Sequence, residues 1–270
     1  MAPSSSCSTT SSPSQRFNIL DICTGSGCIP LGLASALPSK SCNIFGVDIH
    51  PKAIQLCKEN EAKNRSLLNG NRIQFHQADL LDPDAVNIFL SWLQVEVPQP
   101  PSDGTVNPGS RVIKTVPFTE NQEVSGFDLI VSNPPYIAYS EFETLEPEVA
   151  QWEDPKALLA DQEGLIFYPR IANMAMELLH HGRQTWGTSP ASPNSNNSKN
   201  YLSLGRQWRN GPDLDRVKIP ELVFEIGGDH QVDSVVSAVR DAGFSRVEVW
   251  KDLMDRARCI WMRFYVYLKS

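Results

Sequence analysis

Apolar strand-like runs alternate with helical segments from Phe17 onwards, and this alternation constrains the fold more than any other feature of the sequence. The predicted strands cover Phe17–Cys23, Cys42–Val47, Arg72–His76, Phe127–Ser132, Glu221–Ile226, Arg246–Trp250 and Cys259–Leu268. The predicted helices cover Pro30–Leu37, Pro51–Lys63, Asp84–Leu93, Glu163–His180 and Gln231–Ala242. Alternating strands and helices predict an α/β domain in which a mostly parallel sheet carries helices on both faces.

The last two predicted strands depart from this alternation, because no helical pattern separates them. Their connection, Lys251 to Arg258, is too short for the crossover that parallel neighbours need. We therefore expect the final strand to run antiparallel to its neighbour. The doubly wound, seven-stranded sheet would then end in a β-hairpin.

Two stretches rich in Pro, Gly, Ser and Asn interrupt the pattern at about 98–125 and 183–213. Structureless segments of this length are uncommon inside compact domains, so we interpret both as surface insertions. Residues 1–16 are mostly Ser, Thr and Pro and are predicted to form a disordered tail, which leaves 17–270 as one domain. The tail resembles neither a secretory signal nor an Arg-rich mitochondrial presequence.

The amino-acid composition restricts the kinds of partner that this protein is expected to bind. The net charge of -7 argues against non-specific binding to nucleic acid, which needs clustered Lys and Arg. No apolar run approaches the ~18 residues typical of a membrane span. The six cysteines include no Cys-x-x-Cys pair, so no metal site is predicted.

A glycine turn follows the first strand. Residues Asp21 to Gly27 read D-I-C-T-G-S-G and come just before a helix. Gly25 and Gly27 allow a tight turn and close approach of a ligand, and the helix N-terminus offers backbone N–H groups. A purely structural turn would have the same sequence, so the motif alone does not decide between the two interpretations.

Acidic residues at the ends of successive strands favour a nucleoside site. Asp48, followed by Ile49, ends the second strand, where a carboxylate can bind both hydroxyls of a ribose. Asp79 and Leu80 follow the third strand, near the expected position of the base. The third glycine of a dinucleotide fingerprint is absent after Gly27, which disfavours a nicotinamide oxidoreductase.

The fourth strand runs directly into Asn133-Pro134-Pro135-Tyr136. Ligands of open α/β sheets bind beyond the carboxyl ends of the strands, so this loop should face the nucleoside site. Proline removes backbone donors and leaves carbonyl acceptors, the Asn133 side chain adds another acceptor, and Tyr136 offers a flat apolar wall. Such a loop can hold both hydrogens of an NH2 group and aim its nitrogen for in-line substitution. A Pro-rich turn capped by Asn is the structural alternative.

Together these motifs resemble the HemK/PrmC family of release-factor glutamine methyltransferases. Three further segments resemble family patterns: Trp152–Leu158 resembles F-E-P-x-x-A-L with its proline one position later, Glu225–Gly227 resembles E-x-G, and Asp255–Arg258 resembles D-x-x-x-R with one residue fewer. The similarity spans about Phe17 to Phe264 without the two insertions. Asn-Pro-Pro-Tyr by itself is shared with amino-methylating DNA enzymes.

The resemblance implies a class I S-adenosylmethionine-dependent methyltransferase fold. It also implies methylation of the glutamine side-chain amide in the Gly-Gly-Gln motif of a class 1 peptide chain release factor. The implied catalytic residues are Asn133, Pro134, Pro135 and Tyr136. The residues implied to bind the cofactor, S-adenosyl-L-methionine, are Asp21, Cys23, Thr24, Gly25, Ser26, Gly27, Asp48, Ile49, Asp79, Leu80 and Asn133.

The same resemblance gives expectations for partners and location. We expect a monomer whose protein substrate is a release factor. No membrane partner is expected, and contact with nucleic acid is expected only through a release factor on the ribosome. The expected compartment is the mitochondrion of a eukaryote such as a fungus, with the cytoplasm as the alternative.

Three departures from the family pattern keep alternatives open. Cys23 occupies the position of the first glycine, and Leu80 stands where bacterial members often carry an aromatic residue. The family's helical N-terminal domain, with its R-P-E-T-E-like linker, has no counterpart in this sequence. The alternatives are an amino-methyltransferase acting on nucleic acid and a cofactor- or partner-binding module without activity, although the intact Asn133 loop argues against the latter.

Overall fold

The computed structural model describes residues 16–93, 126–142, 145, 154–187 and 220–263. Its strands are β1 (Phe17–Ile22), β2 (Cys42–Asp48), β3 (Arg72–Gln77), β4 (Leu129–Ser132), β5 (Leu222–Glu225), β6 (Arg246–Lys251) and β7 (Ala257–Arg263). Its helices are α1 (Cys28–Ala36), α2 (Pro51–Asn64), α3 (Ala85–Ser91), α4 (Tyr139–Phe142), α6 (Pro155–Leu158), α7 (Asp161–Gly164), α8 (Phe167–Gly187) and α10 (Val232–Asp241), with 3-10 turns η1 (Arg65–Leu67) and η2 (Asp229–Gln231). The predicted insertion at 98–125 lies outside the described residues, as do residues 1–15 of the predicted tail.

The strands form one seven-stranded sheet in the order β3-β2-β1-β4-β5-β7-β6. Strands β1 to β5 pair in parallel, whereas β7 is antiparallel to both β5 and β6. The structure therefore confirms the predicted α/β fold and its antiparallel final strand, and this arrangement is that of class I methyltransferases. The insertion of β7 between β5 and β6 was not predicted.

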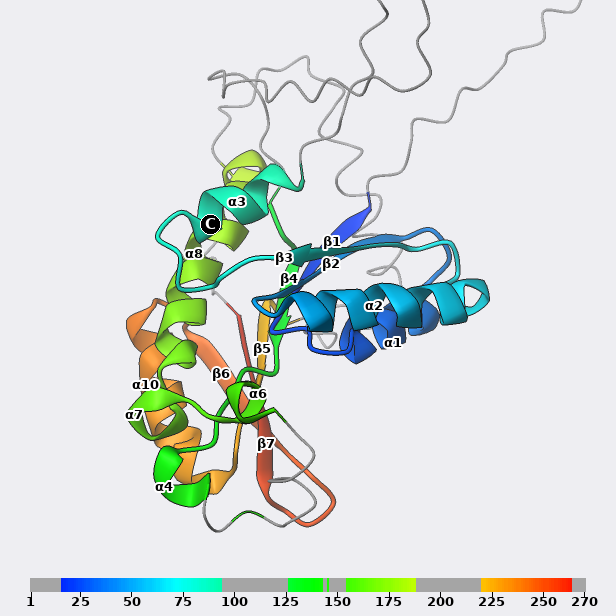
Figure 1. Cartoon of the computed structure of the whole chain (residues 1–270). Helices are drawn as coiled ribbons and strands as arrows, with labels where there is room; N and C mark the ends of the chain where they lie inside the picture. Colours follow the sequence, from blue (N-terminus) through cyan, green and yellow to red (C-terminus); the bar gives the residue numbers. More distant parts are fainter. Residues whose placement is uncertain (1–15, 94–125, 143–144, 146–153, 188–219, 264–270) are drawn as a thin grey trace, which may run out of the picture.

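Helices cover both faces of the sheet. Figure 1 shows α1 and α2 on one side and α3, α8 and α10 on the other. Strand β1 is central, and its residues from Asn18 to Ile22 are buried on both faces, as expected for a parallel strand between two helical layers. Because β1 to β5 are parallel, their carboxyl ends lie at the same edge of the sheet, and the loops that follow them meet there.

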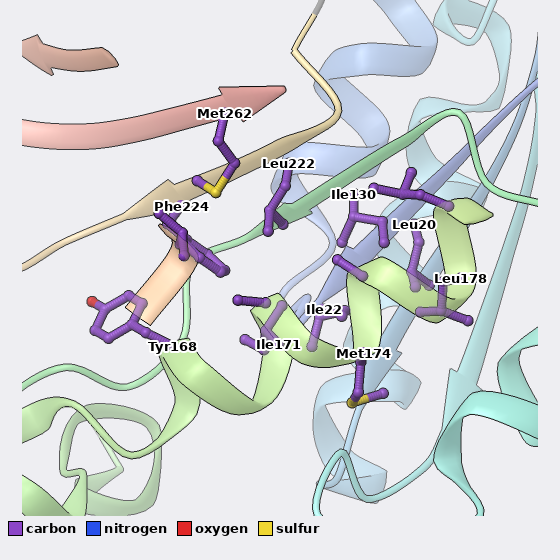
Figure 2. Close-up of a cluster of buried hydrophobic side chains, with 14 of the residues drawn as sticks. Leu20, Ile22, Ile130, Tyr168, Ile171, Met174, Leu178, Leu222, Phe224 and Met262 are labelled. Carbon is purple, nitrogen blue, oxygen red and sulfur yellow. The ribbon is translucent and has the colours of Figure 1, made fainter. Parts of the chain in front are cut away.

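The larger core lies between the sheet and α8. Leu20, Ile22, Ile130, Leu222 and Phe224 project from the strands towards this helix (Figure 2). Helix α8 packs against these side chains with a buried face whose residues recur at helical spacing: Tyr168, Ile171, Met174 and Leu178. Burial of one Leu- or Ile-sized side chain stabilises a fold by about 1.5–3 kcal/mol, so this contact fixes α8 firmly on the sheet.

The predicted helix from Glu163 to His180 was wrong at both ends. Gln162 and Glu163 have left-handed backbones with φ of 55° and 56°, which separates the short α7 from α8. Helix α8 then continues to Gly187, so residues 183–187 of the predicted insertion are helical, and the rest of it lies outside the described residues. Although α8 is 21 residues long, neither it nor another helix in the described ranges is apolar and long enough to cross a membrane.

Candidate active site at the carboxyl edge of the sheet

The glycine turn and the Asn-Pro-Pro-Tyr loop leave the sheet side by side. Ile22 at the end of β1 pairs with Val47 of β2 on one side and with Ser132 of β4 on the other. The Ser132 hydroxyl also donates a hydrogen bond to the Ile22 carbonyl over 2.8 Å. Because β1 and β4 end level, Cys23 and Asn133 begin their loops from neighbouring points of the same edge, and β2 ends one residue further on at Asp48.

The two glycines of the turn serve different purposes. Gly25 has a φ of 54°, and a Cβ atom at this position would meet no atom within 4 Å. Gly27 has a φ of 78°, but here a Cβ would lie 3.1 Å from the Cys57 sulfur and 3.1 Å from the Phe75 ring. Gly27 therefore allows close packing on β3 and α2, whereas Gly25 leaves its backbone open on the outer side, where a ligand can approach it.

Side chains of α2 hold the carbonyls of the turn, and no sequence pattern marks these residues. The Cys57 thiol donates to the Gly25 carbonyl over 3.1 Å, and the Asn60 amide donates to the Ser26 carbonyl over 3.0 Å. Thr24 is tied to β2 through its backbone nitrogen, which donates to the Val47 carbonyl over 2.9 Å. These contacts hold the turn in one conformation.

Asp48 stands opposite the turn. One carboxylate oxygen accepts from the Gly25 nitrogen over 3.0 Å, and the other accepts from the His50 nitrogen over 2.8 Å. Each carboxylate oxygen has more than one acceptor site, so both can still take a ribose hydroxyl. The predicted role of Asp48 is thus compatible with its position, while Ile49 beside it has 60% of its surface exposed.

Asp21 and Thr24 lie beneath the turn as buried polar residues. Asp21 is fully buried, and among the described residues neither of its carboxylate oxygens nor the Thr24 hydroxyl has a hydrogen-bond partner. Burial raises the pKa of Asp21 to about 7; the Thr24 hydroxyl lies close enough to oppose this shift without reaching hydrogen-bond geometry, and the charge of Asp48 adds to the shift. Unpaired buried acceptors are rare in native proteins and are compatible with a polar group of a ligand at this turn.

Cys23, the departure from the family glycine, adopts a left-handed backbone with a φ of 61°. This conformation suits glycine and strains a residue with a Cβ by roughly 1–2 kcal/mol. The side chain packs against the large core. Burial raises the pKa of the Cys23 thiol well above its usual value, and the charges of Asp48 and Asp21 add to the effect, so the sulfur stays protonated.

The loop after β3 carries the two residues predicted near the base. Asp79 is exposed, and its carboxylate accepts from the Leu81 nitrogen over 2.8 Å. Leu80 is only 7% exposed and belongs to the large core, so most of its side chain is covered. Arg170 of α8 holds this loop by donating to the carbonyls of Leu80 and Asp82 over 3.0 and 2.8 Å.

The Asn133–Tyr136 loop presents Asn133 to solvent, while Pro134 is buried and Pro135 and Tyr136 are half-buried. The Tyr136 ring lies against Gly227 at the end of β5, where a Cβ would come within 3.1 Å of the ring. Tyr136 and Gly227 also line a hollow of about 350 Å³, together with Ile137, Glu141, Leu145 and His230.

The family-like segments near the site are mainly structural. Asp154 caps α6 by accepting from the Lys156 nitrogen over 3.0 Å. Arg256 forms an ion pair with Asp252 at 2.8 Å, and Arg258 donates to the Gly227 carbonyl over 3.1 Å. The arginines after Asp255 therefore stabilise the hairpin and the end of β5 in this structure.

Comparison with known proteins identifies relatives of this chain. A release factor glutamine methyltransferase of Fusobacterium nucleatum is 28% identical over 87% of this chain and 51% of its own length. One from Geobacter sulfurreducens is 32% identical over 61% of this chain and 42% of its own length. A bifunctional methyltransferase of Rickettsia conorii is 28% identical over 90% of this chain and 31% of its own length. The chain therefore spans about half, or less, of the curated relatives it matches.

Two further similarities are more limited. The family described as Eco57I restriction-modification methylase matches residues 42–157, which is less than half of the chain but includes Asp48, Asp79 and Asn133. Among solved structures, the hMettl16 catalytic domain in complex with the MAT2A 3'UTR hairpin 1 has a TM-score of 0.46 and 13% identity, covering 92% of this chain and 64% of that one. This structural likeness is too distant to bear on function.

Proposed function

We propose that this chain, a relative of the release factor glutamine methyltransferases, transfers a methyl group from S-adenosylmethionine to a glutamine side-chain amide of a peptide chain release factor. The observation that carries the proposal is the level ending of β1 and β4, with β2 ending one residue further on at Asp48, through the pairing of Ile22 with Val47 and Ser132. It brings a glycine turn suited to a nucleoside next to a loop suited to an NH2 group.

The residues at this edge fit S-adenosylmethionine. Asp48 would accept the ribose hydroxyls, Gly25 would allow the ligand to approach the backbone, and the loop of Asp79 and Leu80 would flank the base. The unpaired carboxylate of Asp21 beneath the turn is compatible with a cationic ligand above it, because a positive charge nearby would favour its ionised form. When bound, S-adenosylmethionine supplies an electrophilic methyl carbon on a sulfonium.

The contribution of the protein to the reaction is orientation. An amide nitrogen is a poor nucleophile because its lone pair is delocalised into the carbonyl. The side-chain carbonyl of Asn133 would accept one amide hydrogen and the backbone carbonyl of Pro134 the other, which aims the nitrogen. Proper alignment of reacting groups can supply several kcal/mol of a reaction barrier without a strong base.

Nucleic acid is the second substrate class to test, because the Eco57I match covers the Asn133 loop. We favour the protein substrate, since the named relatives that match most of the chain are release factor or bifunctional methyltransferases. The net charge of -7 also lacks the excess of Lys and Arg that phosphate binding needs.

The test is a methylation assay with labelled S-adenosylmethionine. Three substrates are compared: a release factor with Gly-Gly-Gln, the same factor with this glutamine changed to alanine, and a DNA duplex. We expect label only in the intact release factor, with peptide mass mapping placing one methyl group on the glutamine. Label in DNA alone, or equal label in both release factors, would overturn the proposal.

A further inference from the structure

The carbonyl of Tyr136, the last residue of the proposed acceptor loop, has a buried hydrogen-bond donor from a distant part of the chain. The side-chain amide of Gln231, 1% exposed, donates to this carbonyl over 2.8 Å. Gln231 lies 95 residues further along the chain, at the junction of η2 and α10. The contact joins the loop after β4 to the loop after β5.

The side-chain oxygen of Gln231 is hydrogen-bonded as well. It accepts from the Gly227 nitrogen over 2.9 Å and from the Tyr168 hydroxyl over 3.4 Å. The Tyr168 hydroxyl has a single proton, which it shares between the Gln231 oxygen and the nearer Glu225 carbonyl at 3.1 Å. Helix α8 and the end of β5 therefore fix the oxygen of Gln231, and this fixes the direction in which its NH2 group points.

An ordinary helix-capping role does not account for Gln231. It occupies the position before the first residue of α10, but its side chain makes no capping hydrogen bond to that helix. The amide is instead turned towards Tyr136 and Gly227, both of which lie at the candidate site. A buried amide with these partners links the backbone of the loop to the sheet rather than stabilising its own helix.

Gly164 lies directly beside the hydrogen bond between Gln231 and the Tyr136 carbonyl and leaves no room for a side chain there. A Cβ at Gly164 would come within 2.1 Å of this carbonyl oxygen and within 2.8 Å of the Gln231 nitrogen. The following residue, Ile137, is fixed as well, because its nitrogen donates to the Leu158 carbonyl over 2.9 Å and its carbonyl accepts from Ala160 over 3.0 Å. These contacts fix the backbone that follows the Asn133–Tyr136 loop in one conformation.

We propose that Gln231 is a positioning residue that sets the Tyr136 carbonyl and thereby aims the Asn133–Tyr136 loop at the acceptor amide. The inference rests on the proposed function for its effect on rate. Gln231 acts through Tyr136 and Gly227 and touches no reacting atom. Because the two prolines make the loop stiff, a shift at Tyr136 is transmitted to Asn133 rather than absorbed between them.

The main test compares Gln231→Met, which keeps the side-chain length but removes the amide, with Asn71→Leu. Asn71 is a buried amide at the opposite edge of the sheet, with hydrogen bonds of 2.9 Å to the Ser41 nitrogen and 2.9 Å to the Ala34 carbonyl. We expect both substitutions to lower the free energy of unfolding, because each removes buried hydrogen bonds. We expect only Gln231→Met to lose single-turnover rate at saturating release factor, by roughly 10- to 100-fold, with cofactor affinity unchanged within about twofold.

Two further measurements keep the inference testable if Gln231→Met folds poorly or the substrate is not a release factor. Tyr168→Phe removes only the hydroxyl that holds the Gln231 oxygen and should lower the rate in the same direction but less. Hydrogen exchange followed by mass spectrometry should show faster exchange of a peptide spanning 133–142 in Gln231→Met and not in Asn71→Leu.

The outcomes separate this inference from the proposed function. If the wild type methylates the release factor and Gln231→Met retains the wild-type rate, Gln231 is not a positioning residue. If the wild type methylates no release factor, the proposed function fails, and the exchange comparison decides the role of Gln231 alone. Equal exchange of the loop peptide in all variants would overturn the inference in either case.

Discussion

The carboxylate of Asp48 and the backbone nitrogen of Gly25 are joined by a hydrogen bond of 3.0 Å that links the end of β2 to the glycine turn after β1. The same carboxylate is the proposed partner of the ribose. Asp48 thus has two roles, since it shapes the turn and offers acceptors to the ligand. The two roles can be separated by substitution.

Asp48→Ala should weaken binding of S-adenosylmethionine by roughly 1.5–3 kcal/mol, because charge-assisted hydrogen bonds to the ribose are lost. Cys57→Ala is the matched control, since it removes the 3.1 Å contact to the Gly25 carbonyl from the other side of the turn and leaves the carboxylate in place. Titration calorimetry measures both. An equal loss in the two variants would mean that Asp48 only supports the turn.

Asn133→Ala should lower the single-turnover rate by roughly 10²-fold or more, because the acceptor amide loses one orienting hydrogen bond. Cofactor affinity should stay nearly constant. Asn133→Asp keeps the acceptor oxygens but adds a negative charge near the sulfonium, which stabilises the charged ground state. Its cofactor affinity should hold or rise while its rate falls. If Asn133→Ala kept the wild-type rate at saturating cofactor, the loop would not orient the acceptor amide.

The buried carboxyl of Asp21 should make the ligand-free protein less stable as the pH rises. Its pKa in the folded state is about 7, against 3.8 for an ordinary aspartate, so the folded state binds the proton more tightly than the unfolded state. The resulting stabilisation is complete below the unfolded pKa and is lost as the pH rises through about 7, on the order of 4 kcal/mol in total.

Asp21→Asn removes this titration and should reduce the fall in melting temperature between about pH 5 and about pH 8. Asp233→Asn provides the control, because it removes one carboxyl from an exposed position and leaves Asp21 in place. Differential scanning fluorimetry without cofactor measures all three proteins. If wild type and Asp21→Asn lost the same number of degrees, the carboxyl of Asp21 would have an ordinary pKa.

Gly164→Ala should destabilise the protein by roughly 2–4 kcal/mol, through strain at a left-handed backbone and overpacking. The φ of Gly164 is 78°, and the new Cβ would lie 2.1 Å from the Tyr136 carbonyl oxygen. Gly32→Ala in α1 is the control, because a Cβ there meets no atom within 4 Å and should stabilise the helix by about 0.5–1 kcal/mol. Urea unfolding that ranked the two variants equally would contradict this geometry.

Local patterns in the sequence predicted most of the sheet, and they placed Asp48 at a strand end next to the glycine turn. Strands such as β1 and β2 are apolar runs bounded by polar residues, and they were located within one residue of their ends. Asp48 was found because a strand end fixes the position of its side chain. These features depend on neighbours in the chain, which periodicity captures.

Features that depend on distant residues were not predictable in this way. The left-handed backbones of Gln162 and Glu163 oppose the usual preference of these residues, and they lead into Gly164, which packs against the distant Tyr136 carbonyl. The contact of Gln231 with Tyr136 bridges 95 residues, and nothing in the sequence around Gln231 marks it. The place of β7 between β5 and β6 also reverses the chain order.

Helix α8 contacts both halves of the site from one turn of its backbone. Tyr168 reaches the Glu225 carbonyl and the Gln231 amide on the acceptor side, whereas Arg170, two residues later, reaches the Leu80 and Asp82 carbonyls on the base side. The helix therefore ties together the loops on both sides of the candidate site. A slide of α8 along its axis would displace both loops together, so their separation depends on one helix and not on two independently moving segments.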